Sequence, residues 1–524
     1  MDCELKASGG AWLSMQLTLD IAAHAEDLSI RIKTSSMPTL LELPRELRDL
    51  IYDHYFSVDG GYVHDFASNK LRQADGQNIE LSLVLVCRQI ADETRALGLR
   101  INTLRFSTFH SDATQVQAGL LHATHESINK RKVSLLNASA PDLLSSEDAQ
   151  TIKIKYPQFA PMIDIWRSHG GLRILDRSDV DCGEAPSIWR DFVAFTLNLV
   201  SQNPGFAAKA KAGSQFWRPY DFDDAMDLNN ACFEPWCIVD ATEIERLQKK
   251  VTYVCDGLPY TWPNAKYSYS AATVSFRFLD SLSNSTRETI RKIVLLEDHQ
   301  SIADPASHGR GYITLCQSHP KMRVERLVCL WETVFPVAKS SMRDFLYGSQ
   351  DLVTKGLLDD ERCPAGEITK AVGMWIKEAM ALFALGMPKD SFTLVLDGDP
   401  IPEHTSHVFS TLQRDAAWQD AFDACYVRGI LAEPSWFDRR INQGYMYEGL
   451  PEVVRTLSPN SSPIRTNFPL GSAESYDVER LLRENQGWSI QDWKEGWARH
   501  EPEEFQTEAP LPPWHLLRWG NVIL

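Results

Sequence analysis

The sequence predicts an α+β fold in which a small helical module and a helical connector precede an α/β region with parallel strands. Apolar residues recur at every third or fourth position in residues 41–55 and 187–200, which is the periodicity of a helix buried along one side. Between residues 236 and 430, three apolar runs each follow a helical segment. Strands that alternate with helices need crossover connections, so these strands are expected to be parallel.

Residues 1–36 are expected to be a poorly ordered extension in front of the module. Their apolar stretch at 11–19 is preceded by two acidic side chains and one lysine. A secretion signal needs a positive start, so no signal peptide is predicted. No later run reaches the roughly 18 apolar residues of a membrane span, so no membrane partner is predicted either.

The first helix of the module is predicted to begin at Pro44, because proline suits the first helical position, where the missing N–H costs nothing. Glu46 lies in the first turn, where the helix dipole favours a carboxylate. A second apolar face follows in residues 81–106, and ordinary core packing is one interpretation of both faces. The first face consists of Leu47, Leu50, Ile51 and Tyr55, and the second of Leu83, Val86, Cys87 and Ile90.

In this order the two segments resemble the F-box, a small helical module that opens with Leu-Pro-x-Glu and closes with a Val-Cys-Arg element. The matching residues are Leu43-Pro44-Arg45-Glu46 and Val86-Cys87-Arg88. The variant with Ile51-Tyr52, Cys87-Arg88-Gln89-Ile90 and Asn102-Thr103-Leu104-Arg105-Phe106 is most similar to F-box-like domains of filamentous fungi. The chain departs from the ordinary F-box in an insertion at 57–80 between the two helices.

This resemblance implies that residues 37–110 form an F-box-like domain whose partner is the linker subunit of a cullin–RING ubiquitin ligase. The partner-binding positions that the resemblance implies are Leu43, Pro44, Leu47, Ile51, Val86 and Cys87.

Residues 111–235 are predicted to be a mainly helical connector. The best-defined helix is 187–200, where large apolar side chains fall on one face.

Residues 236–430 are predicted to be an α/β repeat-like region. The expected strands are 290–298, 324–334 and 391–399, preceded by helices at 272–282, 311–319 and 368–385. Gly386 suits the left-handed position after the third helix. The spacing is compatible with a degenerate leucine-rich-repeat array, although the repeat signature is absent, and a plain three-layer α/β domain is the alternative. This region is also similar to the C-terminal parts of the same fungal proteins.

Residues 431–524 hold six of the fifteen tryptophans. Large aromatic side chains favour an apolar surface, so this segment is expected to dock on the α/β region. An exposed partner-recruiting peptide at 510–519 is the alternative.

The net charge of −17 argues against nucleic acid or an anionic membrane as the main partner. The ten cysteines include no Cys-x-x-Cys pair, which favours a reducing compartment, the cytoplasm or the nucleus.

The chain carries no phosphate-binding loop, dinucleotide-binding motif, nucleophile elbow or zinc-protease motif, so no cofactor is predicted. The segment 308–311 could hold an anion through its backbone N–H groups and Arg310. The candidate metal ligands are Asp397, Asp399, His404 and His407, at the end of the third strand and the start of the next helix. Turn formation and helix capping explain the same residues.

The sequence leaves two candidate functions of different class. The favoured one is a non-enzymatic interaction protein, a ligase adaptor that binds the linker subunit and a protein target. The other is a metal-dependent hydrolase that uses residues 397–407. A purely structural F-box-like fold is a further alternative.

Overall fold

The computed structural model describes residues 39–169, 182–212, 222–251, 265–337, 362–441, 444–457, 463–471, 476–500 and 503–521. The predicted N-terminal extension therefore lies outside the described residues. The chain divides into two compact units, Met1–Phe56 and Ser57–Leu524, and each is presented by itself. Every helix in the described part of the chain is too short or too polar to cross a bilayer.

The first unit contains a 3-10 turn, η1 (Leu40–Glu42), and the helix α2 (Arg45–Phe56). The Pro44 carbonyl accepts the N–H groups of Leu47 and Arg48, so the helix begins one residue later than predicted. The Arg48 guanidinium donates to the Leu43 carbonyl at 2.6 Å and fixes the entry of the chain into α2.

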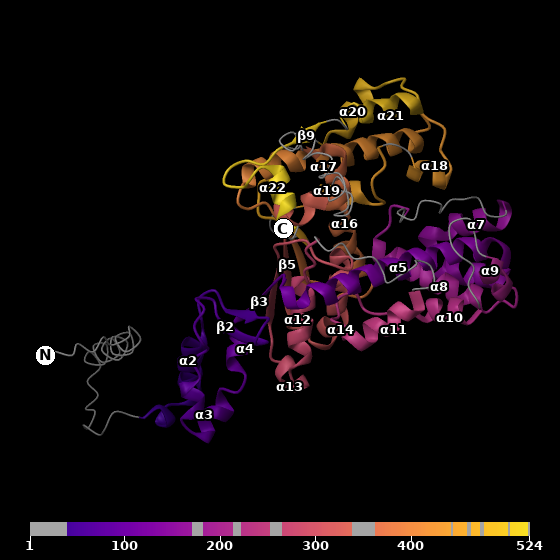
Figure 1. Cartoon of the computed structure of the whole chain (residues 1–524). Helices are drawn as coiled ribbons and strands as arrows, with labels where there is room; N and C mark the ends of the chain where they lie inside the picture. Colours follow the sequence, from indigo (N-terminus) through magenta and orange to yellow (C-terminus); the bar gives the residue numbers. More distant parts are fainter. Residues whose placement is uncertain are drawn as a thin grey trace. The chain divides into compact units, whose positions relative to one another are not determined.

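The second unit is built on a mostly parallel seven-stranded sheet, so the predicted parallel sheet is confirmed (Figure 1). The strand order is β2-β1-β3-β4-β5-β7-β8, and only the β1–β2 pair is antiparallel. The parallel strands therefore lie side by side in the order in which they occur in the chain. Their bounds are β1 (Tyr62–Asp65), β2 (Lys70–Gln73), β3 (Thr103–Ser107), β4 (Lys292–Glu297), β5 (Arg323–Cys329), β7 (Phe392–Asp397) and β8 (Ile464–Thr466).

Helices and turns form the connections between these strands. Between β2 and β3 lie η2 (Ser82–Leu85), α3 (Arg88–Glu93) and α4 (Leu97–Ile101). Between β3 and β4 lie α5 (Asp112–Leu143), α6 (Ser146–Lys155), η3 (Pro157–Phe159), α7 (Ala160–His169), α8 (Pro186–Ser201), α9 (Phe206–Ala212), α10 (Phe222–Asn230), α11 (Ala241–Val251), α12 (Ala271–Asp280) and α13 (Asn284–Arg287). The later connections contain η5 (Pro305–Gly311), α14 (Tyr312–Ser318), η6 (Leu330–Val334), η7 (Phe335–Val337), α16 (Ala365–Ala384), α17 (Pro402–Val427), α18 (Trp436–Ile441) and α19 (Leu450–Thr456).

The helices predicted at 272–282, 311–319 and 368–385 are present as α12, α14 and α16. Gly386 has a φ of +99°, in the left-handed region that its position after α16 requires. The strand predicted at 324–334 is too long, because β5 ends at Cys329 and the π-helix η6 follows. A short apolar run does not distinguish a buried strand from a buried helical turn, which explains the error.

The division of the chain also differs from the predicted one, which ended the first module at residue 110. The structure separates the units after Phe56, and β1, β2 and β3 pair into the same sheet as the strands of 236–430. β8, from the C-terminal segment, joins that sheet as well.

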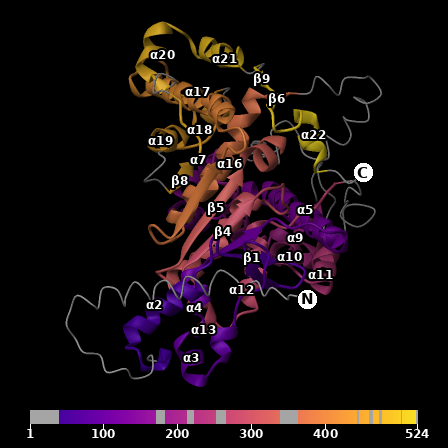
Figure 2. The same ribbon diagram turned by 90° about the vertical axis from the view of Figure 1, so that its left-hand side faces the viewer.

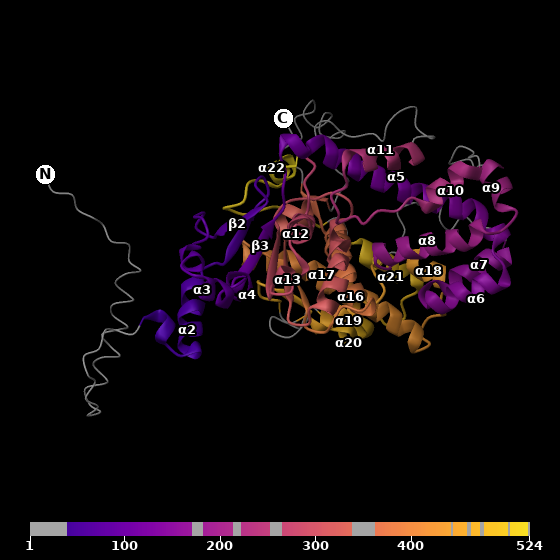
Figure 3. The same cartoon turned by 90° about the horizontal axis from the view of Figure 1, so that it is seen from below.

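The residues between β3 and β4 form a helical region with a core of its own. Trp166, Trp189 and Phe192 from α7 and α8 lie in that core, which is separate from the core around the sheet. Figure 3 shows α6 to α10 gathered at one end of the second unit, with α5 leading from the sheet to them.

The sheet has two unlike faces. The inner face carries buried side chains such as Phe106, Leu295 and Leu394, and helices α12 and α16 pack on it. Because side chains alternate along a strand, the intervening residues point to the outer face. Most of these are half-buried or exposed, and Figure 2 looks onto this face.

The C-terminal segment contains α20 (Val478–Glu484), α21 (Ile490–Ala498), β9 (Glu504–Phe505) and α22 (Trp514–Trp519), and β9 pairs with β6 (Cys363–Pro364). The Trp493 ring lies 5.3 Å from the Trp418 ring and 5.7 Å from the Phe422 ring of α17. Trp497 donates to the buried Asp415 carboxylate at 3.3 Å. These contacts join the segment to the sheet core.

Candidate functional site

The F-box resemblance assigns partner binding to two apolar side chains of α2, Leu47 and Ile51. Both are exposed, as is their neighbour Leu50. The exposed fractions are 47% for Leu47, 66% for Leu50 and 42% for Ile51. Tyr55 is exposed on the same side of the helix, whereas Arg48, Tyr52 and Phe56 are buried. The core-packing interpretation is therefore wrong for this face, since a core face would be the buried one. Leu43 is half-buried and Pro44 is exposed.

The second segment of the resemblance also exposes apolar side chains, within the second unit. Leu85 is 82% exposed and Val86 is 64% exposed, at the end of η2. Cys87 is half-buried and precedes α3, while Ile90 is buried. The implied binding positions thus fall into two sets, Leu43, Pro44, Leu47 and Ile51 in the first unit, and Val86 and Cys87 in the second.

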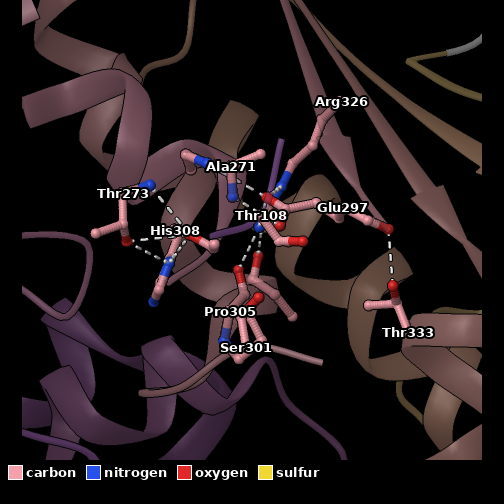
Figure 4. Close-up of polar contacts among 12 residues, drawn as sticks. Thr108, Ala271, Thr273, Glu297, Ser301, Pro305, His308, Arg326 and Thr333 are labelled. Carbon is pink, nitrogen blue, oxygen red and sulfur yellow. Dashed lines mark hydrogen bonds and ion pairs between the residues drawn. The ribbon is translucent and has the colours of Figure 1, made fainter. Parts of the chain in front are cut away.

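A cluster of buried polar contacts lies on the inner face of the sheet and was not predicted (Figure 4). Glu297, the last residue of β4, and Arg326 of β5 form an ion pair at 2.7 Å with side chains that are 0% and 1% exposed. Glu297 also accepts the N–H groups of Ala271 and Ala272 at the start of α12. These contacts satisfy the carboxylate at a helix N-terminus, where a negative charge is favoured.

The Arg326 guanidinium also donates hydrogen bonds to backbone carbonyls of η5. Its guanidinium donates to the Pro305 carbonyl at 2.6 Å and to the Ala306 carbonyl at 3.1 Å. Beside it, the His308 ring lies 2.7 Å from the Ser270 hydroxyl and 2.7 Å from the Ala303 carbonyl. Burial lowers the pKa of His308 to about 3, with a further contribution from Arg326, so the ring is neutral at pH 7.

A neutral histidine beside a serine hydroxyl is the geometry of a nucleophile and its base. Here, however, Ser270 and His308 are both fully buried. Ser270 also accepts the Thr273 N–H as the N-cap of α12. No substrate can reach this hydroxyl without unfolding the core, so the pair caps a helix rather than catalysing a reaction.

A second polar cluster joins the helical region to η5; its His125 ring is buried, whereas the Asp304 side chain at its centre is 45% exposed. The Asp304 carboxylate accepts from the Arg190 guanidinium of α8, which also donates to the Ser307 hydroxyl at 3.1 Å. The His125 ring of α5 lies 3.8 Å from the same carboxylate. Burial lowers the pKa of His125 to about 4. Burial acts to raise the pKa of Asp304, but His125 and Arg190 together lower it to about 2.

The candidate metal ligands at 397–407 do not converge. The Asp397 carboxylate accepts from the Asp399 N–H and from the Asn467 amide. The His404 ring contacts the Gln506 carbonyl at 2.7 Å and the Glu508 carboxylate at 3.0 Å. Within the described residues, no group of three or more His, Cys, Asp or Glu side chains is arranged to hold a metal ion.

The segment 308–311 is not free to cradle an anion. Arg310 donates to the Asp191 carboxylate at 2.5 Å and to the Ser187 carbonyl at 3.3 Å. A Cβ on Gly311 would lie 2.5 Å from the Phe276 ring, so packing explains this glycine. The segment therefore contacts α8 through Arg310 and α12 through Gly311.

The buried ion pair between Glu297 and Arg326 was not predicted, although the sequence contains a pattern that indicates it. Arg326 occupies an inward position between the apolar Val324 and Val328 of one strand, and Glu297 ends the neighbouring strand. A charged residue at an inward strand position needs a buried partner of opposite charge.

No protein-family model, no curated protein and no solved structure matches this chain.

Proposed function

We propose that the chain is a non-enzymatic interaction protein, an adaptor that binds the linker subunit of a cullin–RING ubiquitin ligase through α2. The observation that carries the proposal is the exposed apolar side of α2, with Leu47, Leu50, Ile51 and Tyr55 on one surface. Soluble helices normally bury their apolar side. An exposed apolar side therefore points to a binding partner, and the F-box resemblance names its class.

In the second unit, Val86 and Cys87 are the positions to which the resemblance assigns partner binding, and the exposed Leu85 precedes them. Leu85 and Val86 are among the most exposed apolar side chains in the described part of the chain, and Val86 begins the Val-Cys-Arg element of the resemblance. Binding of the ligase linker subunit would require the chain to be in the cytoplasm or the nucleus.

We further infer that the α/β region is a degenerate repeat array of the leucine-rich-repeat kind, which would present a target-binding surface. The support is the sequential order of the parallel strands. Right-handed crossovers between consecutive neighbouring strands place successive helices on the same face of a sheet, as in such arrays.

The double substitution Leu47→Asp and Ile51→Asp is expected to weaken binding of the purified linker subunit by about 100-fold or more. Both side chains are exposed in the free chain, so stability should change by about 1 kcal/mol or less. Titration calorimetry with the full chain measures the first effect, and thermal unfolding measures the second.

The matched control is Val427→Asp with Ile430→Asp, which places the same charges at two exposed apolar positions beyond α2. This variant should bind like the unmodified chain. Equal binding by the α2 variant would exclude α2 as the docking surface. No binding by the unmodified chain would contradict the adaptor function and favour a purely structural role.

A further inference from the structure

The outer face of the sheet is rich in positive charge, although the chain as a whole has a net charge of −17. Its acidic side chains within the strands are Asp65, Glu325 and Asp397, the last residue of β7. The basic side chains that strand alternation and pairing place on this face are Lys70, Arg72, Arg105, Lys292, Arg323 and Arg465.

Only part of this positive charge is neutralised. Arg72 lies 3.9 Å from Asp65, and Lys292 lies 3.8 Å from Glu325. Arg105 donates to the Gly60 carbonyl, and Arg323 donates to backbone carbonyls beside it. Within the described residues, no carboxylate lies at ion-pair distance from the basic groups of Lys70, Arg105, Arg323 or Arg465.

An apolar strip crosses the middle of the same face. Leu296, Leu327 and Val395 are in register on neighbouring strands β4, β5 and β7. Ser107 continues the row on β3, and Arg465 ends it on β8. The strip is only partly covered, since Leu296 and Leu327 are half-buried, whereas Val395 is buried, with 9% of its surface exposed.

The dimensions of this surface fit an extended polypeptide. Four strand spacings of about 4.8 Å separate β3 from β8, a distance of roughly 19 Å. A fully extended segment of about six residues spans that distance. Such a segment, lying across the strands, would place apolar side chains on the strip and acidic ones near Arg105 at one end and Arg465 at the other.

We propose that the outer face of the sheet binds an acidic, extended segment of a partner protein, with apolar residues at its centre and carboxylates at its ends. Charge complementarity selects this occupant, since the face is basic and the surrounding chain is acidic. The apolar strip favours a polypeptide over nucleic acid, because a nucleic-acid backbone is charged along its whole length and has no apolar side chains to place on the strip. This surface does not include α2, so the proposal stands apart from binding of the ligase linker.

The test uses a fluorescein-labelled peptide of about 12 residues, with a central Leu-Val-Leu-Val run between blocks of glutamate. Fluorescence anisotropy with the full chain should show saturable binding that weakens with added salt. A peptide with lysine in place of glutamate should not bind. The double variant Arg105→Glu with Arg465→Glu should weaken binding by about tenfold, since it reverses the charges at the two ends of the strip.

The matched control is Lys211→Glu with Lys389→Glu, two exposed lysines of α9 and of the turn before β7, which changes the net charge equally. It should leave binding unchanged. Equal weakening by both double variants would show that only net charge matters and would overturn the proposal. Absence of binding to the glutamate peptide, or tighter binding of a single-stranded DNA oligonucleotide of equal charge, would overturn it as well.

Discussion

Substitution of Arg326 by methionine is expected to lower the free energy of unfolding by about 3–5 kcal/mol. Methionine has a similar length but no charge, so the Glu297 carboxylate would remain buried without its counter-ion. The Pro305 and Ala306 carbonyls would lose their donors in the same substitution. Denaturant unfolding of the full chain, followed by tryptophan fluorescence, measures the change.

The double variant Glu297→Gln with Arg326→Met should recover most of this loss, because no unpaired charge then remains in the core. Arg428→Met is the matched control, since Arg428 pairs with Glu479 on the surface. Its effect should be too small to measure. If Arg326→Met were as mild as Arg428→Met, the buried ion pair would not hold the sheet and η5 together.

Acidification from pH 7 to about pH 4 is expected to destabilise the protein through two buried histidines. In the folded state, burial lowers the pKa of His125 to about 4 and of His308 to about 3. An unfolded histidine takes up its proton near pH 6.5. Below that pH the unfolded state therefore binds more protons than the folded state, and stability falls as the pH falls. The two groups together contribute several kcal/mol, on the order of 5.

Asp304 acts in the same direction at lower pH. Its folded pKa of about 2 stabilises the protein above about pH 4, and this contribution is lost as the pH falls towards 2. Glu378 and Asp415 oppose the trend, since burial raises the pKa of each carboxyl and both take up protons earlier in the folded state.

The variant His308→Gln separates the histidine contribution from the others. Glutamine can donate to the Ala303 carbonyl as the ring does, but it cannot become charged. The variant should be less stable at pH 7 and should lose less stability between pH 7 and pH 4. An unchanged pH dependence would show that His308 does not couple folding to protonation.

Local patterns predicted the helices and strands better than they predicted the site. The helical periodicity of 368–385 and Gly386 gave α16 and its end, because these signals depend on neighbouring residues. The candidate metal cluster did not form, because His404 contacts Gln506 and Glu508 about a hundred residues later. No local pattern encodes such a contact.

For the apolar stripe of α2, the sequence predicted the pattern but not its role. Its spacing identified the stripe, but the same spacing is compatible with a core face or a binding face. Only the exposure of Leu47, Leu50 and Ile51 distinguishes the two. The cationic outer face could not be predicted from the sequence either. Lys70 and Arg465 are remote in sequence and share a face only through strand pairing.

The pairing of β3 with β4 has a consequence during synthesis. The two strands are neighbours, yet the whole helical region lies between Ser107 and Lys292 in the chain. At roughly 5–20 residues per second, a ribosome needs about 10–40 s to make that intervening stretch. Throughout this interval the first three strands present an unsatisfied edge, which can pair with other chains. A nascent chain of this kind is expected to depend on chaperones until its fourth strand emerges.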